Sequence, residues 1–450
     1  MNNTKGNTLY FLGIGGIGMS ALARYFKAKG YVVAGYDRTS TALTKKMESE
    51  GISIHYDDNP AKIPANIEFV IITPAVPADT KELQYLREQN VKVIKRSEAL
   101  GMISREHKCV AVAGSHGKTT TTALVTHIMM IAKKKLSAFI GGIARNIDSN
   151  VVIGDRNDEY SIMEADEFDR SFLRLSPYIS IVTSIDADHL DIYGDLQHVI
   201  EGFNDFVGLT ADDGLVVYHE GLPIKTTKPH VTYGFDNADV MAKNLCIKDA
   251  LMVFDVVSRD GKLNMKELSM PLYGEHNVQN ALAAIIVCSH LGVSEQTIRE
   301  SLMSFKGVQW RFEIRVRDEK HVYIDDYGHH PEEIRATLHT ARKVFPGKKM
   351  TVIFQPHLYS RTRDFMDEFA EALSVADTLI LLDIYPAREL PIEGITSEAL
   401  LEKVNVKDKT VCHLDEVVEK IKALDLDMLI TIGAGSIHTL ASQIDDILKK

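Results

Sequence analysis

The chain has 450 residues, of which 45% are hydrophobic and 25% charged, and its formal net charge is −11. This length predicts about three domains, because one domain usually holds ~150 residues, and no apolar run approaches the ~20 residues that a membrane-spanning helix needs. The acidic balance argues against unspecific nucleic-acid binding. The glycine-rich start of the chain lacks the basic lead of a secretion signal. We therefore expect a cytoplasmic protein without membrane insertion.

The four cysteines lie far apart, at Cys109, Cys246, Cys288 and Cys412. None of their spacings is typical of a disulfide framework or of a zinc site. We expect all four to be buried thiols.

The first domain is expected over residues 1–105. It begins with a strand, Thr8–Leu12, and Gly13-Ile-Gly-Gly-Ile-Gly18 then opens a helix. This spacing fits the Gly-x-Gly-x-x-Gly pattern of dinucleotide-binding folds, and Asp37, after a second strand, stands where such folds bind a ribose hydroxyl. Strand-like segments at 69–77 and 91–94 continue a β-α-β-α-β order. Right-handed crossovers build that order into a parallel sheet.

The ligand crevice of such a sheet lies at the carboxyl ends of its strands, where Gly15, Gly16, Gly18 and Thr73 are expected to gather around a diphosphate. The glycine pattern alone does not separate NAD from another nucleotide diphosphate. The alternative is a glycine-rich turn that only packs the helix onto the strand.

The second domain is expected over residues 106–312 and carries Val110-Ala-Val-Ala-Gly-Ser-His-Gly-Lys-Thr-Thr-Thr122. A β-branched strand, a glycine turn and a helix start in this order predict a phosphate-binding loop. Lys118 would neutralise a phosphate, and Thr119 would offer its hydroxyl to Mg²⁺. The spacing is shorter than the common pattern, because Val112 stands where the first glycine would fall. The alternative is an ordinary helix start after a buried strand.

Two further strands of this domain deliver polar side chains. The strand at 160–163 ends at Glu164, and the strand at 178–183 leads to His189. A hard cation beside a phosphate loop needs such ligands, so Glu164 and His189 are the metal candidates. Asn277 and Asn280 share one face of a later helix and either read an adenine edge or cap that helix.

The last domain is expected over residues 313–450. Strands at 322–325, 351–354, 378–382 and 428–432 alternate with helices, which predicts another doubly wound sheet. Two loops that follow strand ends carry histidines and Arg361, and the helix to Leu373 begins after the second loop, at 355–364. We expect these side chains to converge on one crevice and to hold an anionic substrate or phosphate.

Five motifs occur in this order along the chain: Gly114-Ser-His-Gly-Lys-Thr-Thr120, Glu164-Ala-Asp-Glu, Asp186-Ala-Asp-His189, Glu275-His-Asn-Val-Gln-Asn280 and Asp326-Tyr-Gly-His-His-Pro331. Together they resemble the Mur ligases. The glycine loop at 13–18, the loop at 355–363 and Gly433-Ala-Gly-Ser436 favour the alanine-adding branch of that family. So does the lack of any lysine between Arg174 and Lys225, where other branches hold a metal-bridging carbamoylated lysine.

The resemblance implies an α/β fold of three domains: a Rossmann-like N-terminal domain that binds a UDP-sugar rather than NAD, a central P-loop ATPase domain and a Rossmann-like C-terminal domain that binds the amino acid. It further implies an ATP-dependent ligase of peptidoglycan synthesis, which joins L-alanine to the lactyl carboxylate of UDP-N-acetylmuramate through an acyl phosphate. The runner-up is a recycling ligase that attaches a murein peptide to the same sugar. An NAD-dependent oxidoreductase and an ATP-driven switch are alternatives from other classes.

The resemblance also implies roles for individual residues. The catalytic residues are Lys118, His329 and Arg361. The residues implied to bind ATP are Gly114, Ser115, His116, Gly117, Lys118, Thr119, Thr120, Asn277, Asn280, Arg311, Asp326 and Tyr327. The residues implied to bind the UDP-sugar are Gly15, Gly16, Gly18, Met19, Asp37, Thr73, Pro74 and Ala75. Two Mg²⁺ ions are implied, one held by Thr119 and Glu164 and the other by His189.

Two positions depart from the family pattern. Ser184 stands where many relatives have Asn, and Leu358 stands where many alanine-adding members have Arg, which leaves Arg361 as the expected carboxylate clamp. Either His329 or a bound water takes the proton of the amine. The expected partners are ATP, UDP-N-acetylmuramate and L-alanine, with domain closure on binding, and the chain is expected to be a monomer or a weak homodimer.

Overall fold

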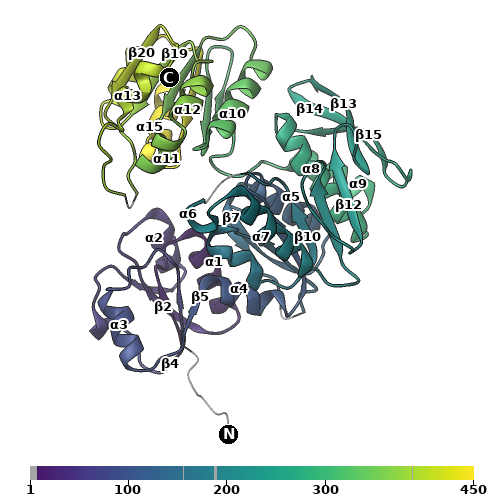
Figure 1. Cartoon of the computed structure of the whole chain (residues 1–450), viewed down its shortest axis with the longest axis vertical. Helices are drawn as coiled ribbons and strands as arrows, with labels where there is room; N and C mark the ends of the chain where they lie inside the picture. Colours follow the sequence, from purple (N-terminus) through teal and green to yellow (C-terminus); the bar gives the residue numbers. More distant parts are fainter. Residues whose placement is uncertain (1–7, 156, 187–189, 388, 450) are drawn as a thin grey trace. The chain divides into compact units, whose positions relative to one another are not determined.

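The computed structural model describes residues 8–155, 157–186, 190–387 and 389–449 (Figure 1). The chain divides into two compact units. Unit 1 holds Met1–Lys248, Val253–Pro271 and Asn277–Lys306, and unit 2 holds Asp249–Met252, Leu272–His276 and Gly307–Lys450. Within the described ranges, no helix combines the length and the apolar character that crossing a bilayer requires.

The first sheet of unit 1 has the strand order β3-β2-β1-β4-β5, and its paired strands run parallel. Its elements are β1 (Thr8–Leu12), α1 (Ile17–Ala28), β2 (Val32–Tyr36), α2 (Ala42–Ser49), β3 (Ser53–His55), η1 (Pro60–Lys62), β4 (Ile67–Ile72), α3 (Lys81–Glu88), β5 (Val93–Lys95) and α4 (Arg96–Ser104). The order reverses at β1, so the glycine loop that follows β1 lies at the switch point where such sheets bind ligands.

The second sheet of unit 1 has the order β15-β14-β13-β12-β11-β10-β6-β9-β7-β8. Its first half comprises β6 (Lys108–Ala113), α5 (Lys118–Ile131), β7 (Leu136–Ala144), β8 (Ser149–Val152), β9 (Tyr160–Glu164), η2 (Phe168–Arg174), β10 (Pro177–Val182), α6 (Leu190–Tyr193) and α7 (Leu196–Gly208). Its second half comprises β11 (Leu215–His219), β12 (His230–Gly234), β13 (Val240–Lys248), β14 (Leu251–Ser258), β15 (Asn264–Met270), α8 (Glu275–His290) and α9 (Glu295–Ser304). β6 pairs in parallel with β10 and β9, which places the ends of these three strands at one edge.

The third sheet, in unit 2, has the order β16-β17-β21-β18-β19-β20, in which only the β16–β17 pair is antiparallel. Its elements are β16 (Glu313–Arg317), β17 (Val322–Asp326), α10 (Pro331–Val344), β18 (Met350–Phe354), α11 (Tyr359–Asp364), α12 (Met366–Leu373), β19 (Thr378–Leu382), α13 (Ser397–Lys403), β20 (Asp408–Cys412), α14 (Val417–Lys422), β21 (Met428–Ile432), η3 (Ser436–Leu440) and α15 (Ala441–Leu448). The strands β17, β18, β19 and β21 are buried throughout.

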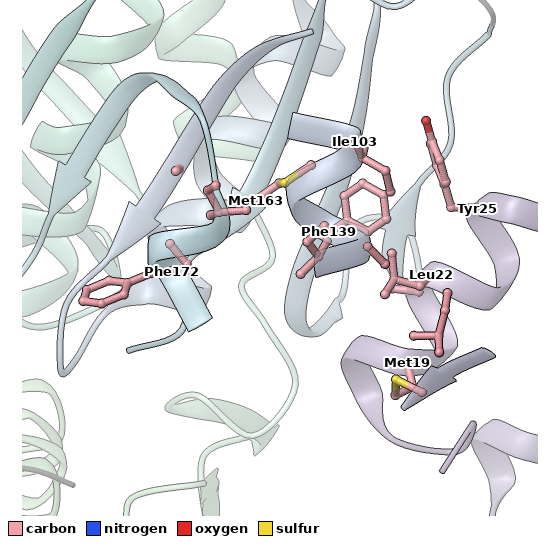
Figure 2. Close-up of a cluster of buried hydrophobic side chains, with 14 of the residues drawn as sticks. Met19, Leu22, Tyr25, Ile103, Phe139, Met163 and Phe172 are labelled. Carbon is pink, nitrogen blue, oxygen red and sulfur yellow. The ribbon is translucent and has the colours of Figure 1, made fainter. Parts of the chain in front are cut away.

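One hydrophobic core joins the first two sheets of unit 1. Figure 2 shows side chains of α1, α4, β7, β9 and η2 that belong to it, and the rings of Tyr25 on α1 and Phe139 on β7 lie 5.2 Å apart. Polar contacts strengthen the junction, because the fully buried Asn150 donates to Ile17 O (2.5 Å) and accepts from Arg24 Nη1 (3.1 Å). The helix that follows the glycine loop is therefore fixed against the β7–β8 hairpin.

The predicted α/β architecture with a parallel N-terminal sheet, a central phosphate-loop sheet and a second doubly wound sheet is confirmed. The strands β11–β15 were not predicted, because segments such as β13 are mostly exposed or half-exposed and mix polar with apolar residues. The expectation that all cysteines are buried is wrong for Cys246, which is exposed on β13. The domain boundaries at 105 and 312 stay predictions.

The loop predicted at 355–364 contains the short helix α11 instead. Its sequence has no apolar periodicity, but the carboxylate of Glu389 accepts the Ser360 N–H (2.9 Å) and the Ser360 hydroxyl at the start of the helix. A cap supplied from about thirty residues away leaves no signal in the local sequence.

Candidate active site

The loop between β6 and α5 has the backbone of a phosphate-binding loop. Gly114 (φ +137°) and Gly117 (φ +81°) adopt conformations that favour glycine. A Cβ at Gly117 would lie 2.5 Å from Asn280 Oδ1, and one at Gly114 would lie 2.0 Å from Thr183 Oγ1. The first N–H groups of α5 have no partners within the helix and carry the positive end of its dipole. The loop is therefore built to receive an anion.

The segment after β10 anchors this loop through backbone and side-chain groups. Ser184 accepts the N–H of Ser115 at its carbonyl (3.1 Å) and the N–H of His116 at its hydroxyl (2.8 Å). In return, Ser115 Oγ accepts the N–H of Asp186 (2.9 Å). Ser184, one of the two departures from the family pattern, thus has a structural task in anchoring the phosphate loop.

The Gly117→Ala substitution is expected to abolish ATP binding, because the new Cβ meets Asn280 and strains a φ of +81°. A matched control is Gly221→Ala, which has the same φ of +81° but nothing within 4 Å. Titration with a fluorescent ATP analogue measures both variants. If Gly221→Ala loses ATP binding to the same degree, backbone strain rather than the shape of the loop explains the result.

Lys118 is held by three acceptors. Its Nζ donates to Gly114 O (2.5 Å), Ser115 O (3.2 Å) and Glu167 Oε1 (2.9 Å), and the Glu167 side chain is only 3% exposed. Burial alone would lower the pKa of Lys118, but the carboxylates Glu167, Glu164 and Asp166 outweigh it and the net pKa is raised. The ammonium is therefore charged at neutral pH. Glu167 was not predicted as a site residue, although it belongs to the same acidic run as Glu164.

Thr119 and Glu164, predicted to share a metal ion, lie side by side. Thr119 Oγ1 donates to Glu164 Oε1 (3.1 Å), and Gly141 N–H donates to Glu164 Oε2 (2.9 Å). Among the residues that the structure describes, no three His, Cys, Asp or Glu side chains converge on one point. Mg²⁺ is usually held by one or two protein oxygens together with phosphate oxygens and water, so this pair of hard oxygen donors fits it. His189 lies outside the described residues.

Asn280 lies directly beneath the phosphate loop. Its Oδ1 accepts the Thr121 hydroxyl (3.1 Å), and its Nδ2 donates weakly to Asn277 Oδ1 (3.4 Å). Both asparagines are buried on α8. Their contacts are those of residues that support the loop, and their role in reading adenine stays a prediction.

In the glycine loop after β1, Asp37 acts as an internal anchor. Its Oδ2 accepts the Gly15 N–H (2.8 Å), and its Oδ1 accepts the Thr39 N–H (3.1 Å). The Gly16 residue is exposed, as are Pro74 and Ala75 in the loop after β4. Asp37 therefore orients the loop that is expected to bind the diphosphate.

A cavity of about 270 Å³ brings the glycine loop and the acidic strand end together. Residues that line it include Gly16, Gly18, Thr73, Arg96, Gly141 and Glu164. Met19, predicted to bind the sugar, also lines it while its side chain belongs to the hydrophobic core. Predicted sugar-binding residues and a predicted metal ligand thus share one cavity within unit 1.

In unit 2, the residues predicted in the last domain form a cluster. The Arg311 guanidinium lies 5.0 Å from the centre of the Tyr327 ring, and the His329 ring meets Tyr327 edge-on at 5.4 Å. The His357 ring lies 5.9 Å from His329. Burial raises the pKa of Tyr327 and lowers the pKa of His329 and of His357, and the positive charge of Arg361 acts on all three groups.

The surroundings of His329 favour the neutral form of its imidazole. Its burial lowers its pKa, Glu333 opposes this shift and the charge of Arg361 adds to it. Nδ1 lies 3.1 Å from Tyr327 O, which can only accept, so we assign the proton to Nδ1 and the lone pair to Nε2. Such a tautomer can accept a proton at Nε2.

Asp326, predicted to bind ATP, has a structural task in unit 2. Its carboxylate accepts the backbone N–H groups of Phe312 (2.6 Å) and Gly328 (2.8 Å), and burial raises its pKa. It thereby ties the chain before β16 to the loop after β17, which carries Tyr327 and His329.

Family models of the Mur ligases match three successive parts of the chain. They are the Mur ligase family catalytic domain over residues 8–108, the Mur ligase middle domain over 112–288 and the Mur ligase glutamate ligase domain over 310–435. The chain is 45% identical over 434 residues to the UDP-N-acetylmuramate–L-alanine ligase of Christiangramia forsetii, covering 95% of this chain and 94% of that protein. It is 44% identical over 448 residues to the ligase of the same name from Cytophaga hutchinsonii, with 97% and 96% covered.

Solved structures show the same relationship. The UDP-N-acetylmuramate-alanine ligase of Thermotoga maritima superposes with a TM-score of 0.85 at 30% identity, over 98% of this chain and 99% of that one. A murein peptide ligase from Psychrobacter arcticus gives a TM-score of 0.72 at 22% identity, over 98% of each chain, and so shares the fold.

Proposed function

The chain belongs to the Mur ligase family, and we propose that it joins L-alanine to the lactyl carboxylate of UDP-N-acetylmuramate, with ATP, in peptidoglycan precursor synthesis. The structural observation that carries this proposal is the cavity in which the glycine loop meets Glu164, next to the phosphate loop. Relatives named for this activity align over nearly the whole chain.

The chemistry explains why both loops are needed. A carboxylate is a poor electrophile, so it first attacks the γ-phosphate of ATP, which gives an acyl phosphate and releases ADP. The neutral amine of alanine then attacks the acyl carbon, and the tetrahedral oxyanion collapses to the amide and phosphate. Both steps develop charge that fixed cations and N–H groups must oppose.

We assign the first step to unit 1. The N–H groups at the start of α5 and the charged Nζ of Lys118 bind the phosphates. When it binds them, Lys118 Nζ gives up its hydrogen bonds to the carbonyls of Gly114 and Ser115. Thr119 and Glu164 would hold Mg²⁺, which would supply positive charge near the transferring phosphoryl group. We propose a second ion at His189, as in the family pattern.

We assign the handling of alanine to unit 2. Arg361 is proposed to bind the carboxylate of the amino acid, because a guanidinium matches a carboxylate in a bidentate manner. His329 Nε2 is proposed to accept the proton that the amine loses, since its Nδ1 is committed to Tyr327 O.

The pH dependence tests the role of His329. Because the pKa of His329 is lowered, its imidazole stays neutral until the pH falls below the range in which an ordinary imidazole takes up a proton. We expect kcat, measured with all substrates saturating, to decline only below that range. The His329→Gln variant should be slower and should lack this acidic decline. If the variant keeps the wild-type rate and profile, a bound water accepts the proton instead.

Phosphate release tests the proposed activity as a whole. It should require ATP, UDP-N-acetylmuramate and L-alanine together. Replacement of L-alanine by a murein tripeptide should give little turnover, whereas preference for the tripeptide would favour the recycling ligase. Hydrolysis of ATP that ignores the sugar would favour an ATP-driven switch, and hydride transfer with NAD would favour an oxidoreductase; either result would overturn the proposal.

We propose that the reaction takes place in the cytoplasm, where its nucleotide substrates are made. A monomer or a weak homodimer stays the expected oligomeric state.

A further inference from the structure

Arg96 stands at the wall of the cavity in unit 1 without an assigned role. It is the first residue of α4, directly after β5 ends at Lys95. Its guanidinium covers the first turn of α1, because Nη1 lies 3.1 Å from the place that a Cβ of Gly18 would occupy. Its Nη2 donates to Asp166 Oδ2 (3.1 Å). Arg96 thus spans the glycine loop and the acidic strand end.

The Arg96 guanidinium has more N–H donors than its hydrogen bond to Asp166 uses. Across the described parts of the chain, Asp166 is the hydrogen-bond partner of the Arg96 side chain, and this single contact uses one of five N–H groups. The Arg96 side chain is only 20% exposed, and it lines the cavity. A partly buried cation with unused donors favours an anionic ligand.

The charge of the cavity supports the same conclusion. Its lining residues, as far as the structure describes them, include two carboxylates, Glu164 and Asp166, and one cation, Arg96. An anionic substrate would be repelled by these carboxylates unless a cation stood between them and the ligand. Arg96 is the cation of this lining that contacts one of the two carboxylates, Asp166.

We propose that Arg96 is a substrate-binding residue that gives up part of its contact with Asp166 to bind an oxyanion of the sugar nucleotide. This inference rests on the proposed function. The substrate offers two such groups, the diphosphate and the lactyl carboxylate. The diphosphate fits better, because the guanidinium covers Gly18 at the positive end of α1, where a diphosphate is expected.

A purely structural reading of the same contact predicts something different. Arg96 and Asp166 come from the first and second sheets of unit 1, so their ion pair could serve only to hold these two parts together. In the neighbouring pair Lys95–Asp169 (2.7 Å), the Lys95 side chain is more exposed than that of Arg96 and neither residue lines the cavity, which makes Lys95 a matched control.

Asp166→Asn separates the two readings by the sign of its effect. Asp166 Oδ1 accepts the Phe168 N–H (3.1 Å), a contact that asparagine preserves, while the charge that competes for Arg96 is removed. If Arg96 binds substrate, Asp166→Asn should tighten binding of the sugar nucleotide. If the pair is only a clamp, Asp166→Asn should weaken binding or stability in the same direction as loss of Arg96.

Calorimetric titration with three probes identifies the oxyanion. UDP carries the diphosphate alone, UDP-N-acetylglucosamine adds the sugar, and UDP-N-acetylmuramate adds the lactyl carboxylate. In Arg96→Gln we expect the Kd of all three to rise about 10- to 100-fold, as for loss of one charge-assisted contact. Arg96→Lys should recover part of the affinity, and Lys95→Gln should bind like wild type. A rise confined to UDP-N-acetylmuramate would assign the lactyl carboxylate as the ligand and would still support the role of Arg96.

Unchanged Kd values for all three probes in Arg96→Gln would overturn the inference, as would weaker binding in Asp166→Asn. Thermal unfolding of each variant shows whether a loss of binding reflects a loss of folding. If Arg96→Gln unfolds, binding is compared in Arg96→Lys, which retains the positive charge. Failure of the wild-type chain to bind UDP-N-acetylmuramate would instead contradict the proposed function.

Discussion

Lys118→Ala is expected to lower kcat by at least ~10³-fold, because it removes the cation that opposes charge on the transferring phosphoryl group. The substitution also leaves Glu167, which is 3% exposed and bonded to Lys118 Nζ, as a buried carboxylate without its cation. A modest loss of stability should therefore accompany the loss of activity. Binding of UDP-N-acetylmuramate should persist, since Lys118 does not line the cavity beside the glycine loop.

ADP formation and sugar binding must be measured on the same preparation to test this expectation. Glu164→Ala should likewise abolish ADP formation. Lys262→Ala, in which an exposed lysine of the same unit is removed, should leave both quantities unchanged. Turnover of Lys118→Ala near the wild-type rate would show that the phosphate loop does not serve the chemical step. The double variant Lys118→Ala/Glu167→Gln should recover stability without recovering activity.

The features that could be predicted from the sequence are those that depend on residues close together in the chain. The strand–glycine–helix arrangement around Gly114–Thr120 follows from local backbone rules, because glycine is required where φ is positive and a helix start attracts phosphate. The same holds for the glycine loop after β1. Glu164 could be placed near the phosphate loop because β9 pairs in parallel with β6 and both strands end at one edge.

The supporting contacts were not predictable, because each depends on residues far apart in sequence. Ser184 anchors the phosphate loop through partners about seventy residues away, and Glu389 caps α11 from outside it. Glu167 follows Glu164 by three residues, yet its burial against Lys118 depends on the path of η2. Arg96 had a usable signal, since it directly follows β5, and the end of a parallel strand is where ligand-binding residues gather.

In unit 2, the structure indicates the protonation state of His329, which could not be derived from the sequence. The positions of the histidines and Arg361 after strand ends predicted that these side chains converge, and the rings of Tyr327, His329 and His357 do lie together. The protonation state of His329 follows only from its burial and from the carbonyl at its Nδ1. These two facts turn a choice between His329 and water into an assignment that can be tested.

Arg361→Ala is expected to raise the KM for L-alanine about 10- to 100-fold, as for loss of a charge-assisted contact to a carboxylate. The KM values for ATP and UDP-N-acetylmuramate should change little. Arg363→Ala is the matched control, because Arg363 lies on the same helix but is half-exposed and paired with Asp364 (2.7 Å). Initial rates with each substrate varied in turn give the three KM values.

The same variant has a second consequence through His329. The charge of Arg361 lowers the pKa of that imidazole, so its removal should raise the pKa and move the acidic decline of kcat to higher pH. Arg361→Lys retains the charge but loses the bidentate geometry, and it should keep the decline near its wild-type position while KM for L-alanine still rises. A rise in the KM for ATP with an unchanged KM for L-alanine would assign Arg361 to the nucleotide instead of the amino acid.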